Sequence, residues 1–188
     1  MTRLIAFIAA VTLVSASGCQ YNPAAAQFPN VVDSLTLYAL NGTPPSSPIG
    51  LDLKTGSGVR LDQSFIFDVA FDLDTAGRVN LMPVRVLANG LTSVRSVGVQ
   101  IINAPYEAYT EAASNGYKYD STLVVAVGAT VAINPLDAST CTVYSLGTSY
   151  YAKLIVDSVN ASARALYVRM TADPNCGYRT LTPGVPKK

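Results

Sequence analysis

The chain has 188 residues, with 13 basic and 12 acidic side chains, three cysteines and no histidine. Apolar residues make up 49% of it and charged residues 13%, a balance that indicates a folded domain with a sizeable core and argues against general disorder. Without histidine, neither a Ser-His-Asp nor a Cys-His mechanism can operate. The near-zero net charge and the lack of any basic run argue against a nucleic-acid partner.

Residues 1–18 are predicted to be a signal peptide. Arg3 supplies the positive start, and Leu4–Val14 is an almost unbroken apolar run. That run is far shorter than the roughly 20 residues a helix needs to span a bilayer, so a transmembrane anchor or a buried helix is the weaker interpretation. The small residues of Ser15–Cys19 follow it, as expected at the cleavage site of an exported protein.

The segment Ala16-Ser17-Gly18-Cys19 resembles the lipobox of bacterial lipoproteins. The resemblance implies cleavage before Cys19 and a lipid anchor on its sulfur, hence attachment to a membrane of the cell envelope. The family usually has Leu where this chain has Ala16, so cleavage by an ordinary signal peptidase stays open, after Ala16 or after Ala24-Ala25-Ala26. Either cut would release a soluble secreted domain. Gln20, in place of an Asp after the cysteine, implies the outer membrane.

Residues 19–30 are predicted to form the lipidated cysteine and a flexible tether, because Tyr21–Asn30 is rich in Pro and Ala and lacks periodicity. Residues 31–188 have the length of a single domain. Pro44–Pro48 is interpreted as a loop between strands and not as a domain boundary.

Period-two alternation predicts strands, most clearly in Phe65–Leu73, where the apolar side chains would face the core while Asp68 and Asp72 face water. Pro83 would confine its own strand to an edge or a bulge. Four further runs are rich in β-forming residues: Leu35–Leu40, Val79–Leu87, Val97–Ile102 and Thr140–Leu146.

Asp72–Gly77 begins like a calcium loop, with alternate carboxylates followed by glycine. The later ligands of such a loop are missing: Ala76 stands at one of the liganding positions, and Pro83 stands where the closing glutamate is expected. The favoured interpretation is a turn between two strands, and no metal or cofactor is expected.

Pro105–Ser114 is predicted to contain one or two helical turns, with Glu107 and Glu111 at helical spacing on an exposed face. A carboxylate pair can hydrolyse glycosides, but an exposed helix face explains these two glutamates more economically.

Four tyrosines, Tyr106, Tyr109, Tyr117 and Tyr119, form the one local enrichment that suits a recognition surface. The alternative, which is favoured, is that they pack across strands as peripheral core. The absence of tryptophan weakens a carbohydrate-binding interpretation.

Leu123–Ile133 is nearly continuous in Val, Ala and Ile, which is typical of a central strand covered on both faces. Lys153–Val159 and Arg164–Met170 are interpreted as a hairpin that turns at Asn160–Ala163.

Cysteine counting predicts a disulfide. If Cys19 carries lipid, Cys141 and Cys176 remain as an even pair in an oxidising compartment. Two free buried thiols are the alternative. A zinc site is disfavoured, because two cysteines without histidine cannot supply the usual four ligands.

The predicted fold is an all-β antiparallel sandwich, Ig-like or transthyretin-like, of seven to nine strands with at most one short helix. The expected function is a non-catalytic binding or interaction module, anchored to the membrane, with an envelope protein or a glycan as partner. A structural lipoprotein that maintains the envelope is the alternative.

Overall fold

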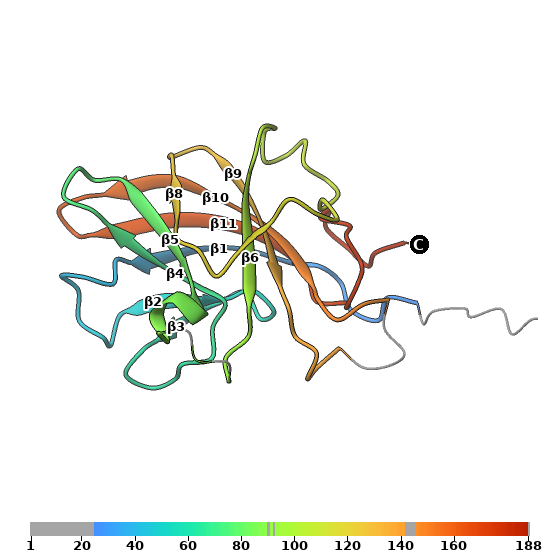
Figure 1. The fold of residues 1–188 in the computed structure, drawn as a ribbon. Coiled ribbons are helices and arrows are strands. Elements are labelled where there is room, and N and C mark those ends of the chain that lie inside the picture. Colours follow the sequence, from blue (N-terminus) through green and yellow to red (C-terminus); the bar gives the residue numbers. More distant parts are fainter. Residues whose placement is uncertain (1–24, 90, 92, 142–145, 188) are drawn as a thin grey trace, which may run out of the picture.

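The computed structural model describes residues 25–89, 91, 93–141 and 146–187. Two antiparallel sheets pack face to face, which confirms the predicted all-β sandwich (Figure 1). The first sheet has the order β1 (Val31–Tyr38), β11 (Ala165–Asp173), β10 (Tyr151–Asn160), β9 (Thr130–Pro135), β6 (Val97–Ile102), β7 (Lys118–Tyr119). The second has the order β3 (Ser57–Arg60), β2 (Pro48–Asp52), β4 (Val69–Leu73), β5 (Val79–Pro83), β8 (Leu123–Val125).

The core lies between the two sheets, where alternate side chains of each strand meet. Its largest fully buried members include Phe71 and Leu81 from the second sheet and Leu154, Leu166 and Met170 from the first. Burying such apolar surface is the main favourable term in folding. Strands β2, β3 and β7 were not predicted: β2 and β3 are short and carry glycine or proline, and β7 has only two residues, too few to show alternation.

The described residues contain one short helix, α1 (Val84–Leu87), where the sequence predicted the end of a strand. Pro83 pairs with Val69 at the end of β5, beyond the last residue of β5 that pairs with β8, so its missing N–H interrupts no ladder there. The predicted helical segment at 105–114 contains a single turn, in which the amides of Ala108 and Tyr109 bond to the carbonyl of Pro105. None of the described helices is long and apolar enough to cross a membrane.

The predicted strand at Phe65–Leu73 is shorter than expected, and one of its faces was assigned wrongly. The strand begins at Val69, and Ile66 is 70% exposed in the loop before it. Asp68, expected to face water, is fully buried. Its carboxylate is held there by distant polar partners, which a local alternation pattern cannot reveal.

The apolar run Leu123–Ile133 divides between the two sheets. Its first part forms β8 at an edge, and its second forms β9, which is flanked by β10 and β6 and buried along its whole length, as expected for a central strand. The chain passes from one sheet to the other at Gly128, whose φ of 81° is readily accessible only to glycine.

The predicted hairpin is confirmed as β10 and β11, the two longest strands. Its turn is held by the side chain of Asn160, which accepts a hydrogen bond from the Ala163 amide at 3.1 Å. The Cys141–Cys176 disulfide is also confirmed, and it encloses the whole hairpin. The predicted strand Thr140–Leu146 falls partly outside the described residues, and Thr140 and Cys141 lie in a turn.

We expect the double variant Cys141→Ser/Cys176→Ser to lose roughly 3–4 kcal/mol of unfolding free energy, the chain-entropy value for a loop of this size. The sequence separation of 35 residues sets that estimate. Urea denaturation of the oxidised wild type and the variant would measure the loss. Reductant should destabilise only the wild type; an equal effect on both proteins would contradict the assignment.

Candidate functional site

The outer face of the six-stranded sheet is covered by two loop segments that pair with each other. Glu111 and Thr180 form an isolated antiparallel bridge, and the Ala112 amide donates to the carbonyl of Arg179 at 2.8 Å. Leu181, on the same ribbon, is fully buried. This ribbon forms a second, smaller packed layer outside the sandwich.

Tyr106 is the centre of that layer and is itself buried, so it does not present its ring to solvent. The Lys153 ammonium lies 4.4 Å from the ring centroid and donates to the carbonyls of Tyr106 and Tyr109 at 2.8 and 2.9 Å. The Arg169 guanidinium lies 5.0 Å from the same ring. These are cation–π contacts that hold the covering loop on the sheet. Burial lowers the pKa of Lys153.

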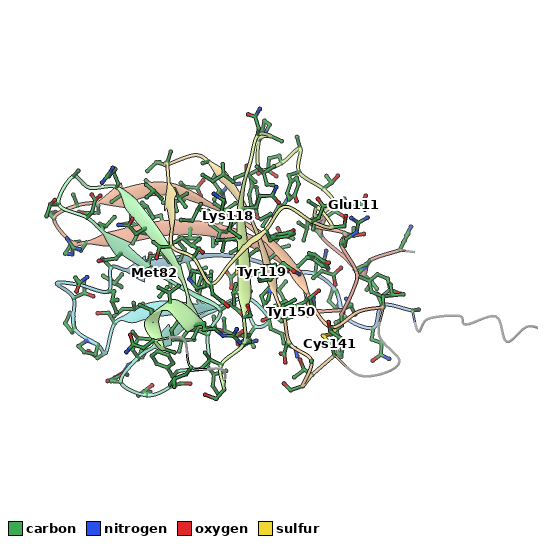
Figure 2. All side chains as sticks on the ribbon, viewed as in Figure 1. Met82, Glu111, Lys118, Tyr119, Cys141 and Tyr150 are labelled. Atoms are coloured by element: carbon green, nitrogen blue, oxygen red, sulfur yellow. A yellow bond between two sulfur atoms is a disulfide. The ribbon has the colours of Figure 1, made fainter. Side chains whose placement is uncertain are left out.

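The other three tyrosines lie beside it over the same sheet; Figure 2 labels Tyr119. The Tyr109 hydroxyl accepts a hydrogen bond from the Ala113 amide at 2.7 Å, and the Tyr119 hydroxyl donates to Asn134 at 2.6 Å. Burial, together with the neighbouring Tyr109 hydroxyl, raises the pKa of Tyr117. Tyr119 is 41% exposed. The structure therefore brings the four predicted residues to one face but engages most of them in internal packing.

Each of the two glutamates is paired with an arginine. Glu107 bonds to Arg169 at 2.7 Å, and Glu111 forms an ion pair with Arg179. Exposed ion pairs of this kind contribute little to stability. At the candidate calcium loop, the Asp74 carboxylate accepts hydrogen bonds from the amides of Ala76 and Arg78, both at 2.9 Å, which confirms the predicted turn.

A buried ionic cluster, which the sequence did not reveal, links the two sheets. The Asp68 carboxylate accepts hydrogen bonds from the Tyr150 hydroxyl at 2.7 Å and the Leu53 amide at 2.8 Å. The Arg95 guanidinium lies 3.2 Å from Asp68, donates to the Tyr150 hydroxyl at 2.7 Å and lies 3.5 Å from Asp137. Among the residues that the structure describes, no group of three or more His, Cys, Asp or Glu side chains suits a metal ion.

The cluster shifts the protonation of its members. Burial raises the pKa of Asp68 to about 6, although Arg95, Tyr150 and Leu53 act in the opposite direction. Burial is the largest effect on Arg95 and acts to lower its pKa, but the charges of Asp68, Tyr150, Asp137 and Asp52 together act in the opposite direction, and the net shift is upward. Asp68 has no exposed surface, and its carboxylate contacts protein groups from both sheets.

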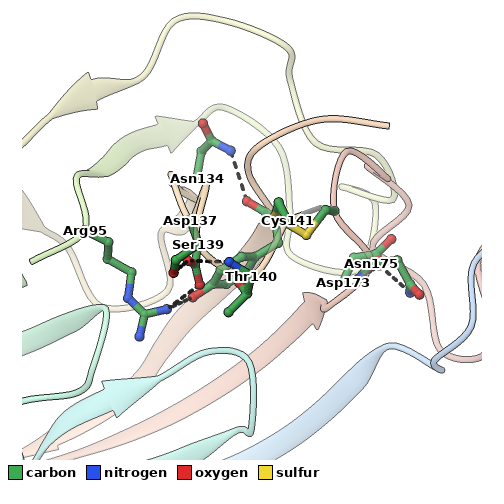
Figure 3. The surroundings of a disulfide bond; sticks show 10 residues. Arg95, Asn134, Asp137, Ser139, Thr140, Cys141, Asp173 and Asn175 are labelled. Atoms are coloured by element: carbon green, nitrogen blue, oxygen red, sulfur yellow. Dashed lines mark hydrogen bonds and ion pairs between the residues drawn. A yellow bond between two sulfur atoms is a disulfide. The ribbon is translucent and has the colours of Figure 1, made fainter. Parts of the chain in front are cut away.

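A groove lies at the end of the sandwich where the described chain begins, and we call it the N-terminal groove. It has a volume of about 620 Å³. The first described residues, the turn after β2 and the disulfide region line it. Figure 3 shows the surroundings of the disulfide. The groove is lined by Ala25, Ala26, Gln27, Phe28, Pro29, Val31, Lys54, Thr55, Thr140, Pro174, Asn175, Cys176 and Tyr178.

Asn175, next to the disulfide, fastens the N-terminal wall of this groove. Its side-chain oxygen accepts hydrogen bonds from the amides of Gln27 and Phe28 at 2.8 and 3.0 Å, and its side-chain nitrogen donates to the Phe28 carbonyl at 2.8 Å. The same nitrogen donates to Asp173 at 2.8 Å. The chain from Gln27 onward, which belongs to the predicted tether, is therefore fastened to the domain. Sequence reasoning missed Asn175, because its partners lie almost 150 residues away.

Cys19 lies outside the described residues. In comparisons with known proteins, no family model, no curated protein and no solved structure matches this chain.

Replacing Asp68 by Asn tests the protonation of the buried cluster. The pKa of Asp68 in the folded protein, about 6, lies above its ordinary value of 3.8, so the folded state binds an extra proton between these values. Binding this proton stabilises the folded state. The stabilisation is fully present below the ordinary pKa of 3.8 and is lost as the pH rises through the folded-state pKa of about 6. We expect the unfolding free energy of the wild type relative to Asp68→Asn to fall by at most about 3 kcal/mol between about pH 4 and pH 7.

Denaturant titrations at a series of pH values would measure this difference. Carboxylates elsewhere titrate in both proteins and cancel. Parallel pH profiles for the two proteins would mean that Asp68 remains charged throughout.

Replacing Asn175 by Ala tests the clamp on the N-terminal segment. The variant leaves the amides of Gln27 and Phe28 without their acceptor, and we expect both to exchange hydrogen faster, with a loss of about 1–3 kcal/mol in unfolding free energy. Hydrogen exchange resolved by residue would show it. Asn115→Ala, in an exposed turn, is the matched control, and unchanged exchange at Gln27 and Phe28 in the Asn175 variant would contradict the clamp.

Proposed function

We propose that this chain is an exported bacterial lipoprotein, anchored through Cys19, whose β-sandwich is a non-catalytic binding module at the surface of a cell-envelope membrane. The observation that carries the proposal is the N-terminal groove beside the clamped segment Gln27–Phe28. A concave, largely apolar hollow of several hundred Å³ is the usual form of a small-molecule site.

The geometry of the clamp supports an anchored orientation. Gln27 follows Cys19 by eight residues, which reach at most about 28 Å when fully extended. A lipid on Cys19 would therefore keep the end of the sandwich that bears the groove close to the membrane. Two or three acyl chains on one cysteine give stable anchoring, whereas one chain binds only marginally.

The disulfide fits this compartment, because such bonds persist outside the cytoplasm. The tyrosines over the six-stranded sheet offer a second contact surface, of which Tyr119 is the most exposed member, for an envelope protein or a glycan.

The intact mass of the mature protein, extracted with detergent from its own cells, tests the anchor. We expect a chain that begins at Cys19, carries added acyl mass and gains two hydrogens when the Cys141–Cys176 bond is reduced. A lipid-free chain that begins at Ser17 or Gln27 would refute the anchor and indicate a soluble secreted protein. Cys19→Ser is the control, since it should abolish the acyl mass.

A further inference from the structure

We propose that the N-terminal groove binds a single acyl chain with an anionic head group, a diffusible lipid whose head lies against Lys54. The inference rests on the proposed function, because it assigns a ligand class to that binding module. The groove volume, about 620 Å³, falls in the range of about 300–1,000 Å³ that small-molecule sites occupy.

The groove is apolar although several of its residues are polar. Both donors of the Asn175 amide are used by Phe28 and Asp173, and its oxygen already accepts two hydrogen bonds, from Gln27 and Phe28. An asparagine amide has no further donor to offer. The Thr55 hydroxyl donates to Asp52 at 2.8 Å. The apolar residues Ala26, Phe28, Pro29, Val31 and Pro174 also line the groove, and such a lining favours an aliphatic ligand.

The charge of the lining selects the sign of the head group. Lys54 is the one charged residue among the described lining residues, and no carboxylate lines the groove. The nearby carboxylate of Asp52 is engaged by the Lys54 amide at 3.1 Å and by Thr55. An anionic head at the Lys54 ammonium would gain a charge-assisted hydrogen bond, whereas a cationic head would be repelled.

The position of the groove suits a lipid. Its wall starts at Ala25, six residues after the cysteine that is proposed to carry the anchor. A ligand taken from or delivered to the membrane would thus enter at the end of the sandwich closest to the bilayer.

Calorimetric titration of the mature Cys19→Ser protein with palmitate, below its micellar concentration, tests the site. We expect one palmitate per chain, and binding of hexadecanol, which has the same chain without the charge, weaker by up to about fivefold. Lys54→Met should reduce palmitate affinity to the hexadecanol level and leave hexadecanol unchanged. Lys118→Met, an exposed lysine on β7, is the matched control and should alter neither affinity.

Ala26→Trp, which fills the groove, should abolish binding of both lipids while the disulfide and the thermal midpoint stay unchanged. Absence of palmitate binding to the Cys19→Ser protein, or full binding to Ala26→Trp, would overturn the site. Equal affinities for palmitate and hexadecanol would overturn the role of Lys54. If the lipidated wild type refuses palmitate while Cys19→Ser accepts it, the protein's own acyl chain occupies the groove, and the diffusible ligand is refuted.

The titration does not depend on the anchor, because the Cys19→Ser protein lacks it. Failure of lipid binding and failure of lipidation, which intact mass detects, are therefore separate results.

Discussion

The disulfide between Cys141 and Cys176 is the constraint on which the N-terminal end of the molecule depends. It joins the turn after β9 to the segment that follows β11. The bond thereby fixes the position of Asn175, the residue before Cys176. Asn175 then supplies the hydrogen bonds that fasten Gln27 and Phe28. Without these hydrogen bonds the segment at Gln27 and Phe28 would be less ordered, because each immobilised backbone residue costs about 1–2 kcal/mol of conformational entropy.

The same region is coupled to the interior of the sandwich. The Cys141 amide donates to the carbonyl of Asp137 at 2.9 Å, and the Asp137 carboxylate lies beside Arg95 (Figure 3). Arg95 and Tyr150 in turn bind Asp68 between the sheets. Buried charges are tolerated only where they are paired and hydrogen-bonded, so each member of this chain of contacts requires the others. Hydrogen bonds and ion pairs thus connect the disulfide region to the interior of the sandwich.

On the outer face of the six-stranded sheet, the tyrosines mainly make internal contacts. Tyr106 lies under Lys153 and Arg169, and its neighbours bond to loops and to the sheet, so the cluster closes the outer face of β10 and β11. The partly exposed edge of this cluster lies at Tyr119, which Figure 2 labels.

The sequence by itself determined the all-β class, the β10–β11 hairpin, the buried central strand β9 and the disulfide, because alternation, turn residues and cysteine parity are local or countable properties. Only the tertiary structure decided that Asp68 is buried, that Asn175 holds Gln27, and that the run Leu123–Ile133 divides between two sheets. Each of these depends on partners distant in sequence. The alternation pattern predicts that Asp68 faces water, but its ion pair with Arg95 holds it inside. A groove forms only where separate segments of the chain meet.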